Sequence, residues 1–193
     1  WHIAHWFNTD GPLRVADLRG QVVLIHAFQM LCPGCVIHAI PQARKAHELY
    51  GEQGVAVIGL HTVFEHHDAM QPHALQAFIH EYGLRFPVGV DAASADGQPV
   101  PRTMARLGLR GTPTTLVLDK QGRLRLNHFG HVDDLPLGTI LGRLQAEATS
   151  SAQSFSGAGT WIFAILLILV GAAGVWSNRK LRAADNAQQL AAA

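Results

Sequence analysis

The only two cysteines of this 193-residue chain, Cys32 and Cys35, are separated by Pro33 and Gly34. Side chains three residues apart are neighbours on one helical turn, so the two sulfurs are expected to lie within bonding reach. Such a pair can exchange disulfides: a Cys32 thiolate attacks a substrate disulfide, and Cys35 resolves the mixed disulfide. A structural disulfide and half of a metal site are the alternatives for a Cys-x-x-Cys unit.

The sequence around this motif predicts a strand before it and a helix after it. Val22 to Phe28 is a continuous apolar run broken only by His26, which is typical of a buried strand. Residues 35–50 have helical periodicity, and Pro41 is expected to kink this helix. Cys32 would then lie at the start of the helix, where unpaired amide N–H groups and the helix dipole stabilise a thiolate. The pKa of the first cysteine in such motifs can fall to about 3.5–7.5.

The rest of the first 148 residues alternates between predicted strands and helices. We expect further strands at 55–60, 86–90, 114–118 and 123–129, and further helices at 71–82, 100–109 and 133–148. The order β-α-β-α-β-α-β-β-α predicts an α/β redox domain over residues 1–148. Its central mixed sheet would be flanked by helices on both faces.

A different composition follows this domain. Residues 149–160 are rich in Ser, Gly and Ala and are predicted to be a flexible linker, and residues 161–177 are apolar with Trp161 and Trp176 at the two ends. An uncharged stretch of roughly 20 residues can span about 30 Å of hydrocarbon, so we predict one C-terminal transmembrane helix. A buried C-terminal helix is the alternative.

The predicted tail, residues 178–193, carries Arg179, Lys180 and Arg182 directly after the apolar segment. By the positive-inside rule this tail is cytoplasmic, which places the redox domain on the extracytoplasmic, periplasmic side of the membrane. The net charge is +1, and no cluster of Lys and Arg precedes Arg179. This pattern argues against a nucleic-acid-binding surface. No cofactor and no resident metal are expected.

Several motifs resemble the TlpA/redoxin branch of the thioredoxin superfamily. They are residues 17–25, the Cys-Pro-Gly-Cys unit, residues 111–115 and residues 118–122, and the resemblance covers about residues 7–147. It implies a thioredoxin-like fold and a thiol:disulfide oxidoreductase that acts on protein thiols and disulfides and uses an upstream electron donor.

The resemblance also implies a cis-proline at Pro113 facing the cysteines. Thr112 would then offer backbone groups to an extended substrate, and Pro33 and Gly34 are expected on the same substrate-binding surface. An ordinary proline at a strand entry is the alternative for Pro113.

His26 lies six residues before Cys32, inside the predicted strand. In thioredoxin-like proteins this position often holds a buried acid beneath the second cysteine. Our hypothesis is that His26 accepts the Cys35 proton during resolution, because an imidazole that titrates near neutrality suits general base catalysis. The alternative is a hydrogen-bonded core histidine.

Other functions remain open from the sequence. A copper-delivery protein could hold Cu(I) with both cysteines and a loop histidine. A peroxiredoxin-type peroxidase is disfavoured, because Ile25 and Gln29 occupy positions where that family has Pro and Thr. A membrane-linked binding module with an inert disulfide is the non-enzymatic alternative. His61, Glu65, His66 and His67 crowd one loop, which we interpret as a polar loop rather than a metal site.

Overall fold

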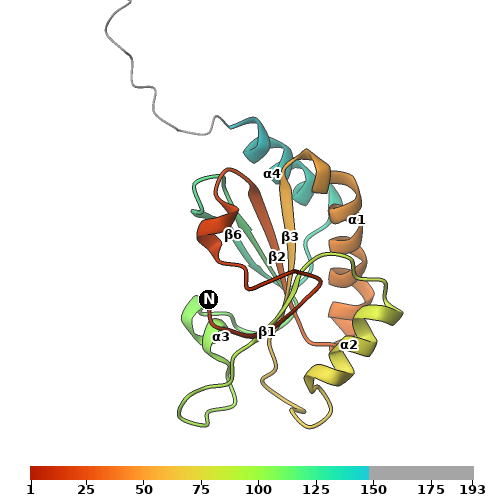
Figure 1. Cartoon of the computed structure of the whole chain (residues 1–193). Helices are drawn as coiled ribbons and strands as arrows, with labels where there is room; N and C mark the ends of the chain where they lie inside the picture. Colours follow the sequence, from red (N-terminus) through yellow and green to blue (C-terminus); the bar gives the residue numbers. More distant parts are fainter. Residues whose placement is uncertain (148–193) are drawn as a thin grey trace, which may run out of the picture. The chain divides into compact units, whose positions relative to one another are not determined.

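The computed structural model describes residues 1–147, and a six-stranded mixed sheet forms its centre (Figure 1). The strand order is β1-β4-β3-β2-β5-β6. The three central strands β2, β3 and β4 are parallel, and β1, β5 and β6 are antiparallel to their neighbours. The strands are β1 (Ile3–Phe7), β2 (Val22–Phe28), β3 (Val55–His61), β4 (Val88–Asp91), β5 (Thr114–Leu118) and β6 (Leu124–Phe129).

Helices cover both faces of the sheet, as the sequence predicted. One face packs against α1 (Ile40–Tyr50), α2 (Pro72–Glu81) and α4 (Asp134–Ala146), and the other packs against the short 3-10 helix η1 (Val15–Leu18) and α3 (Arg102–Leu107). Side chains of β2 alternate between the two faces: Leu24 and Phe28 belong to the first core, Val23 and Ile25 to the second. All seven residues of β2 are buried, which explains its continuous apolar run.

Most predicted elements are confirmed, and the differences have local causes. β2 and β5 have the predicted bounds. β4 begins at Val88 rather than at residue 86, since Pro87 has no backbone N–H to donate to a neighbouring strand. The sequence analysis missed β1, which lies at the edge of the sheet and has no regular alternation of buried and exposed residues.

The helix after the motif has two parts. A π-helical turn, η2 (Cys35–Ala39), precedes α1, and the N–H of Ile40 donates to the carbonyl of Cys35, five residues earlier. Pro41, at the first turn of α1, has no N–H of its own. The widened turn therefore lies where the proline was expected to kink the helix.

The predicted linker, transmembrane helix and tail, residues 149–193, lie outside the described residues. Within residues 1–147, no helix has both the length and the apolar character needed to cross a bilayer.

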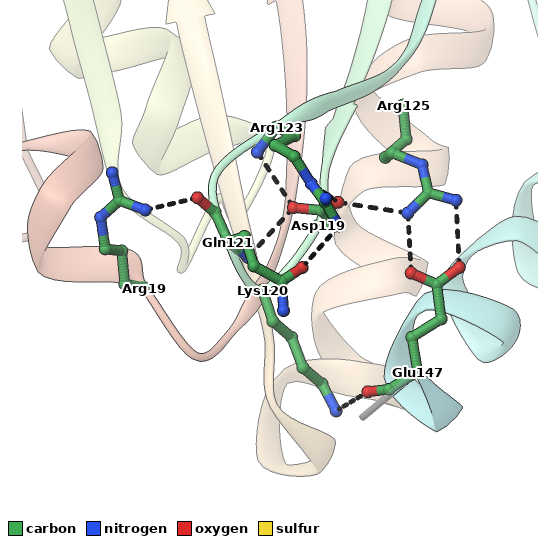
Figure 2. A network of polar contacts seen from close by, with 7 residues as sticks. All are labelled: Arg19, Asp119, Lys120, Gln121, Arg123, Arg125 and Glu147. Carbon is green, nitrogen blue, oxygen red and sulfur yellow. Dashed lines mark hydrogen bonds and ion pairs between the residues drawn. The ribbon is translucent and has the colours of Figure 1, made fainter. Parts of the chain in front are cut away.

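A charged network fastens the β5–β6 turn to the end of α4 (Figure 2). The side chain of Asp119 is buried and accepts hydrogen bonds from the side chains of Arg123 (2.8 Å) and Arg125 (3.1 Å). Arg125 also forms a bidentate ion pair with Glu147, with N–O distances of 2.7 and 3.0 Å. Burial alone would raise the pKa of Asp119, but hydrogen bonds from the Arg123 and Gln121 backbone and from both arginines lower it to about 2.

This network predicts a specific loss of stability in acid. The ordinary pKa of an Asp carboxyl is 3.8, so the lowered pKa of Asp119 stabilises the native state fully above about pH 4. The contribution is lost as the pH falls through about 2. Asp119→Asn is expected to reduce the free energy of unfolding by about 1–3 kcal/mol at neutral pH, with the difference from wild type shrinking below pH 4.

Urea unfolding of both proteins at several pH values measures this difference. Asp10→Asn serves as the control, because Asp10 is exposed. An equal loss at neutral pH for both variants would contradict the prediction.

Candidate redox site

The Cys-Pro-Gly-Cys motif lies at the carboxyl end of β2, between the strand and the helix. The N–H of Cys32 donates to the carbonyl of Gln29 at 3.1 Å, and the carbonyl of Cys32 accepts from the N–H of Val36 at 3.0 Å. The second bond is the first of the helical type, so Cys32 immediately precedes the first turn. The predicted junction of strand and helix is confirmed.

The two thiols are free and differ in solvent access. Cys32 is half-buried, whereas Cys35 has no exposed surface. The N–H of Cys35 donates to Sγ of Cys32 at 3.3 Å, which provides the helix-start amide that the sequence analysis expected. Burial, followed by the hydrogen bond with the Cys32 thiol, raises the pKa of Cys35 to about 12. Cys35 is therefore a protonated thiol at neutral pH.

The structure brings the predicted proline loop next to the motif. The Thr112–Pro113 peptide bond is cis, and the carbonyl of Thr112 lies 3.6 Å from Sγ of Cys32. Gly34 faces the proline ring: a Cβ placed on Gly34 would lie 3.4 Å from Cδ of Pro113. Four of the predicted residues, Cys32, Gly34, Thr112 and Pro113, thus share one small surface, beside exposed Pro33.

The central position of β2 explains this assembly. β5 runs antiparallel to β2, and its first residue, Thr114, pairs with Ala27 near the end of β2. The residues just before β5 therefore meet the residues just after β2. The Thr114 hydroxyl donates to the carbonyl of Gly111 at 2.7 Å, and the N–H of Gly130 donates to the carbonyl of Pro113 at 2.8 Å, so the loop is fixed at both sides.

His26 is buried on the face of β2 that also holds Leu24 and Phe28, the face covered by the helix of Cys35. Its Nδ1 lies 3.3 Å from the Thr115 hydroxyl, and its Nε2 has no hydrogen-bond partner among the described residues. Burial, with a smaller contribution from His131, lowers the pKa of His26 to about 4. His26 is therefore neutral at physiological pH, with one nitrogen bound to Thr115 and one unpaired.

The sequence analysis gave no structural role to a second set of contacts, on the other side of the motif. The N–H of Met30 donates to Nε2 of His61 at 3.4 Å. The Gln29 side chain accepts from the N–H of Phe64 (3.2 Å) and donates to Glu65 (3.3 Å). These bonds join the segment before Cys32 to the loop after β3. The only sequence signal was the polar residue Gln29 directly after an apolar strand.

The residues of the crowded histidine loop have separate environments in the part of the chain that the structure describes. No group of three or more His, Cys, Asp or Glu side chains there could hold a metal ion. His61 is buried and bonded to Met30, and His67 lies 3.3 Å from the carbonyl of Pro99.

Comparison with known proteins gives one family and several similar structures. The sequence model described as the AhpC/TSA family matches residues 6–127. A crystal structure of a thioredoxin-like superfamily protein is 54% identical, covers 76% of this chain and 94% of its own, and superposes with a TM-score of 0.73. A thiol-disulfide isomerase from Corynebacterium glutamicum is 51% identical with the same coverage and TM-score. These similarities confirm the predicted thioredoxin-like fold.

A curated relative, Protein DipZ of Mycobacterium tuberculosis, is 30% identical over 148 residues. The match covers 76% of this chain but only 20% of DipZ, so the chain spans a fifth of the length of this relative.

Proposed function

Because this chain belongs to the AhpC/TSA family, we propose that it is a thiol:disulfide oxidoreductase that reduces or exchanges protein disulfides through Cys32 and Cys35. One observation carries this proposal: the accessible sulfur of Cys32 accepts a hydrogen bond from the backbone N–H of the buried Cys35 and lies beside the cis-proline loop of Thr112 and Pro113. The name of the similar Corynebacterium glutamicum protein, a thiol-disulfide isomerase, supports the same activity.

The proposed reaction has two exchange steps. The Cys32 thiolate attacks one sulfur of a substrate disulfide, a Cys32–substrate S–S bond forms, and the other substrate sulfur leaves as a thiolate and takes a proton. Cys35 then loses its proton and attacks Sγ of Cys32, which forms the Cys32–Cys35 disulfide and releases the second substrate thiol. The substrate is reduced by two electrons, and an upstream dithiol donor must reduce the Cys32–Cys35 disulfide again.

The opposite environments of the two sulfurs support this order of events. The Cys35 amide N–H stabilises negative charge on Sγ of Cys32 by a charge-assisted hydrogen bond. Cys35, with its pKa raised to about 12, exposes no surface to a large substrate. The first attack therefore falls to Cys32, and Cys35 reacts only with a sulfur already bonded beside it.

The proline loop supplies the proposed substrate-binding surface. An extended polypeptide bound along Thr112 and Pro113 would place its sulfur at Cys32, because the Thr112 carbonyl is 3.6 Å from that sulfur. Pro33 and Gly34 would extend this surface on the motif side, because Gly34 faces the Pro113 ring, with 3.4 Å between a Cβ built on Gly34 and Cδ of Pro113. Main-chain pairing of this kind accepts many sequences, because its hydrogen bonds do not involve side chains.

We expect cysteine variants to separate the two steps. Cys32→Ser should lose exchange activity to the level of buffer, because at neutral pH only roughly one part in 10⁵ of a thiol with a pKa of about 12 is ionised. Cys35→Ser should accumulate a covalent adduct with a disulfide-containing protein. Non-reducing gels and mass spectrometry measure the adduct, and the double variant is the control. Full turnover by Cys32→Ser, or no adduct with Cys35→Ser, would contradict the mechanism.

His26 is the proposed acceptor of the Cys35 proton. In the tautomer in which Nδ1–H donates to the Thr115 hydroxyl, the unpaired Nε2 is a free acceptor, and the place of His26 on the Cys35 face of β2 supports the assignment. The described residues show no direct hydrogen bond between His26 and Cys35, so the proposal requires a bridging water. With a pKa of about 4, His26 is a weak base, so we expect its rate contribution to be at most about a hundredfold, the low end of general base catalysis.

Replacing His26 by Ala should slow release of the mixed disulfide by up to about a hundredfold and leave the first attack by Cys32 unchanged. Rapid-mixing kinetics of the wild type and the variant measure the rate of mixed-disulfide formation and the rate of its release. Thr115→Val is the matched control, because it removes the hydrogen bond at Nδ1 and keeps the imidazole. An unchanged release rate in His26→Ala would dismiss the proposed role.

We also propose that residues 161–177 anchor the chain in a membrane, with the redox domain on the extracytoplasmic side. The support comes from the sequence alone: an uncharged apolar segment bounded by Trp161 and Trp176 and followed by three cations.

On cell fractionation, the full chain should sediment with membranes, and a chain that ends at residue 148 should remain in the supernatant. A full chain that stays in the supernatant at high salt and alkaline pH would exclude the anchor.

A further inference from the structure

Four exposed residues lie in the segments that flank the redox site, and we call them the Cys32 rim: Leu31, Ile37, Arg110 and Phe129. Leu31 directly precedes Cys32, Ile37 follows Cys35 by two residues, Arg110 precedes Thr112 by two residues, and the Phe129 ring lies against Gly111. We propose that the rim selects, among protein disulfides, those in which apolar residues and an acidic residue lie next to the target cysteine. This inference rests on the proposed function and adds the chemistry of its substrate.

The apolar part of the rim consists of two exposed side chains, one on each side of the motif in the sequence. Leu31, directly before Cys32, is 56% exposed, and Ile37, two residues after Cys35, is 65% exposed. Large apolar side chains that stay in water beside a reactive group commonly mark a binding surface. Their position on both sides of the motif allows contact with residues that flank a captured sulfur.

The cationic part of the rim is held in place by packing. The Arg110 guanidinium lies over the Phe129 ring, 5.2 Å from its centroid. The Phe129 ring in turn lies against Gly111, where a Cβ would approach the ring to 2.8 Å. Glycine at position 111 thus lets the aromatic ring cover the backbone just before Thr112, and the ring supports the arginine.

The charge of Arg110 is available to a ligand. Within residues 1–147, Arg110 forms no ion pair. The nearby carboxylates do not pair with Arg110: Glu65 accepts a hydrogen bond from the neutral Gln29 side chain, and Asp133 lies 3.4 Å from Nε2 of His131. His131 stacks near His38, at 4.6 Å between ring centroids. The rim therefore favours an anionic partner.

Chain geometry gives the expected position of the acid. Arg110 precedes Thr112 by two residues, and the Thr112 carbonyl lies 3.6 Å from Sγ of Cys32. An extended substrate advances about 3.3 Å per residue, so a side chain that meets Arg110 lies about two residues from the captured cysteine. A carboxylate at that distance can bind the guanidinium while its cysteine bonds to Cys32.

A set of three peptides tests the charge preference. Each contains one cysteine in a mixed disulfide with a neutral small thiol, and carries Asp, Asn or Lys two residues from that cysteine, on either side. The measured quantity is the second-order rate constant with the reduced full-length chain in detergent. We expect the Asp peptide to react about three- to tenfold faster than the Lys peptide at low salt, with the difference shrinking at high salt.

Charge reversal at the rim provides the comparison. Arg110→Glu should invert the ratio of Asp to Lys rates, and Arg110→Gln should bring it near one. Arg85→Glu is the matched control, because Arg85 is exposed and precedes β4, at the opposite end of the parallel strands from Cys32. It makes the same charge change and should keep the wild-type ratio.

The apolar preference is measured with the Asn peptide in two forms, with Leu or Ser next to the cysteine. Ile37→Ser should reduce the advantage of the Leu form, whereas Leu124→Ser, at the far end of β6, should not.

Equal rates for Asp and Lys peptides in wild type, or an unchanged ratio in Arg110→Glu, would overturn the inference while leaving the oxidoreductase proposal intact. Failure of the wild type to react with any peptide, the Asn form included, would instead reject the proposed function.

Discussion

The difference in environment between two neighbouring sulfurs is the constraint on which the rest of this structure depends. Cys32 is half-exposed and receives the N–H of Cys35, whereas the Cys35 thiol is buried and its pKa is raised to about 12. Burial disfavours the Cys35 thiolate, whereas the sulfur of Cys32 is accessible and accepts a hydrogen bond from a backbone amide. The two steps of disulfide exchange need this asymmetry. The attacking sulfur must be accessible to the substrate, and the resolving thiol must stay unreactive until the mixed disulfide has formed.

The sheet maintains that asymmetry by placing β2 between two different neighbours. Its parallel partner β3 brings His61 beside Phe28, and its antiparallel partner β5 brings Thr114 beside Ala27. The end of β2 therefore meets a histidine loop on one side and the cis-proline loop on the other. Hydrogen bonds to Met30 and Gln29 hold the backbone just before Cys32, and the proline ring lies against Gly34.

The polar and charged side chains at the two ends of the sheet have different surroundings. At the carboxyl end of β2, Cys32 is half-buried, and Leu31 before it and Arg110 before the cis-proline loop are exposed. At the other end, Asp119 and its arginine partners are satisfied among themselves and join the β5–β6 turn to α4 (Figure 2). Arg125 is therefore engaged in ion pairs with Asp119 and Glu147 that stabilise the fold. Arg110 has no acidic partner among the described residues, so its guanidinium is free to bind a ligand.

The sequence by itself determined the local features: the bounds of β2 and β5, the helix after the motif, and the placement of Cys32 where a strand gives way to that helix. Periodicity and the Cys-Pro-Gly-Cys spacing are short-range signals, and short-range geometry decides those features. The nearness of Thr112 to Cys32, 80 residues apart, was expected from family resemblance, and only the pairing of β5 with β2 produces it. The bonds of Gln29 and His61, the edge strand β1, and the support of Arg110 by Phe129 were decided by tertiary structure alone. Each depends on segments distant in the chain, whose register and packing leave no periodic trace in the sequence.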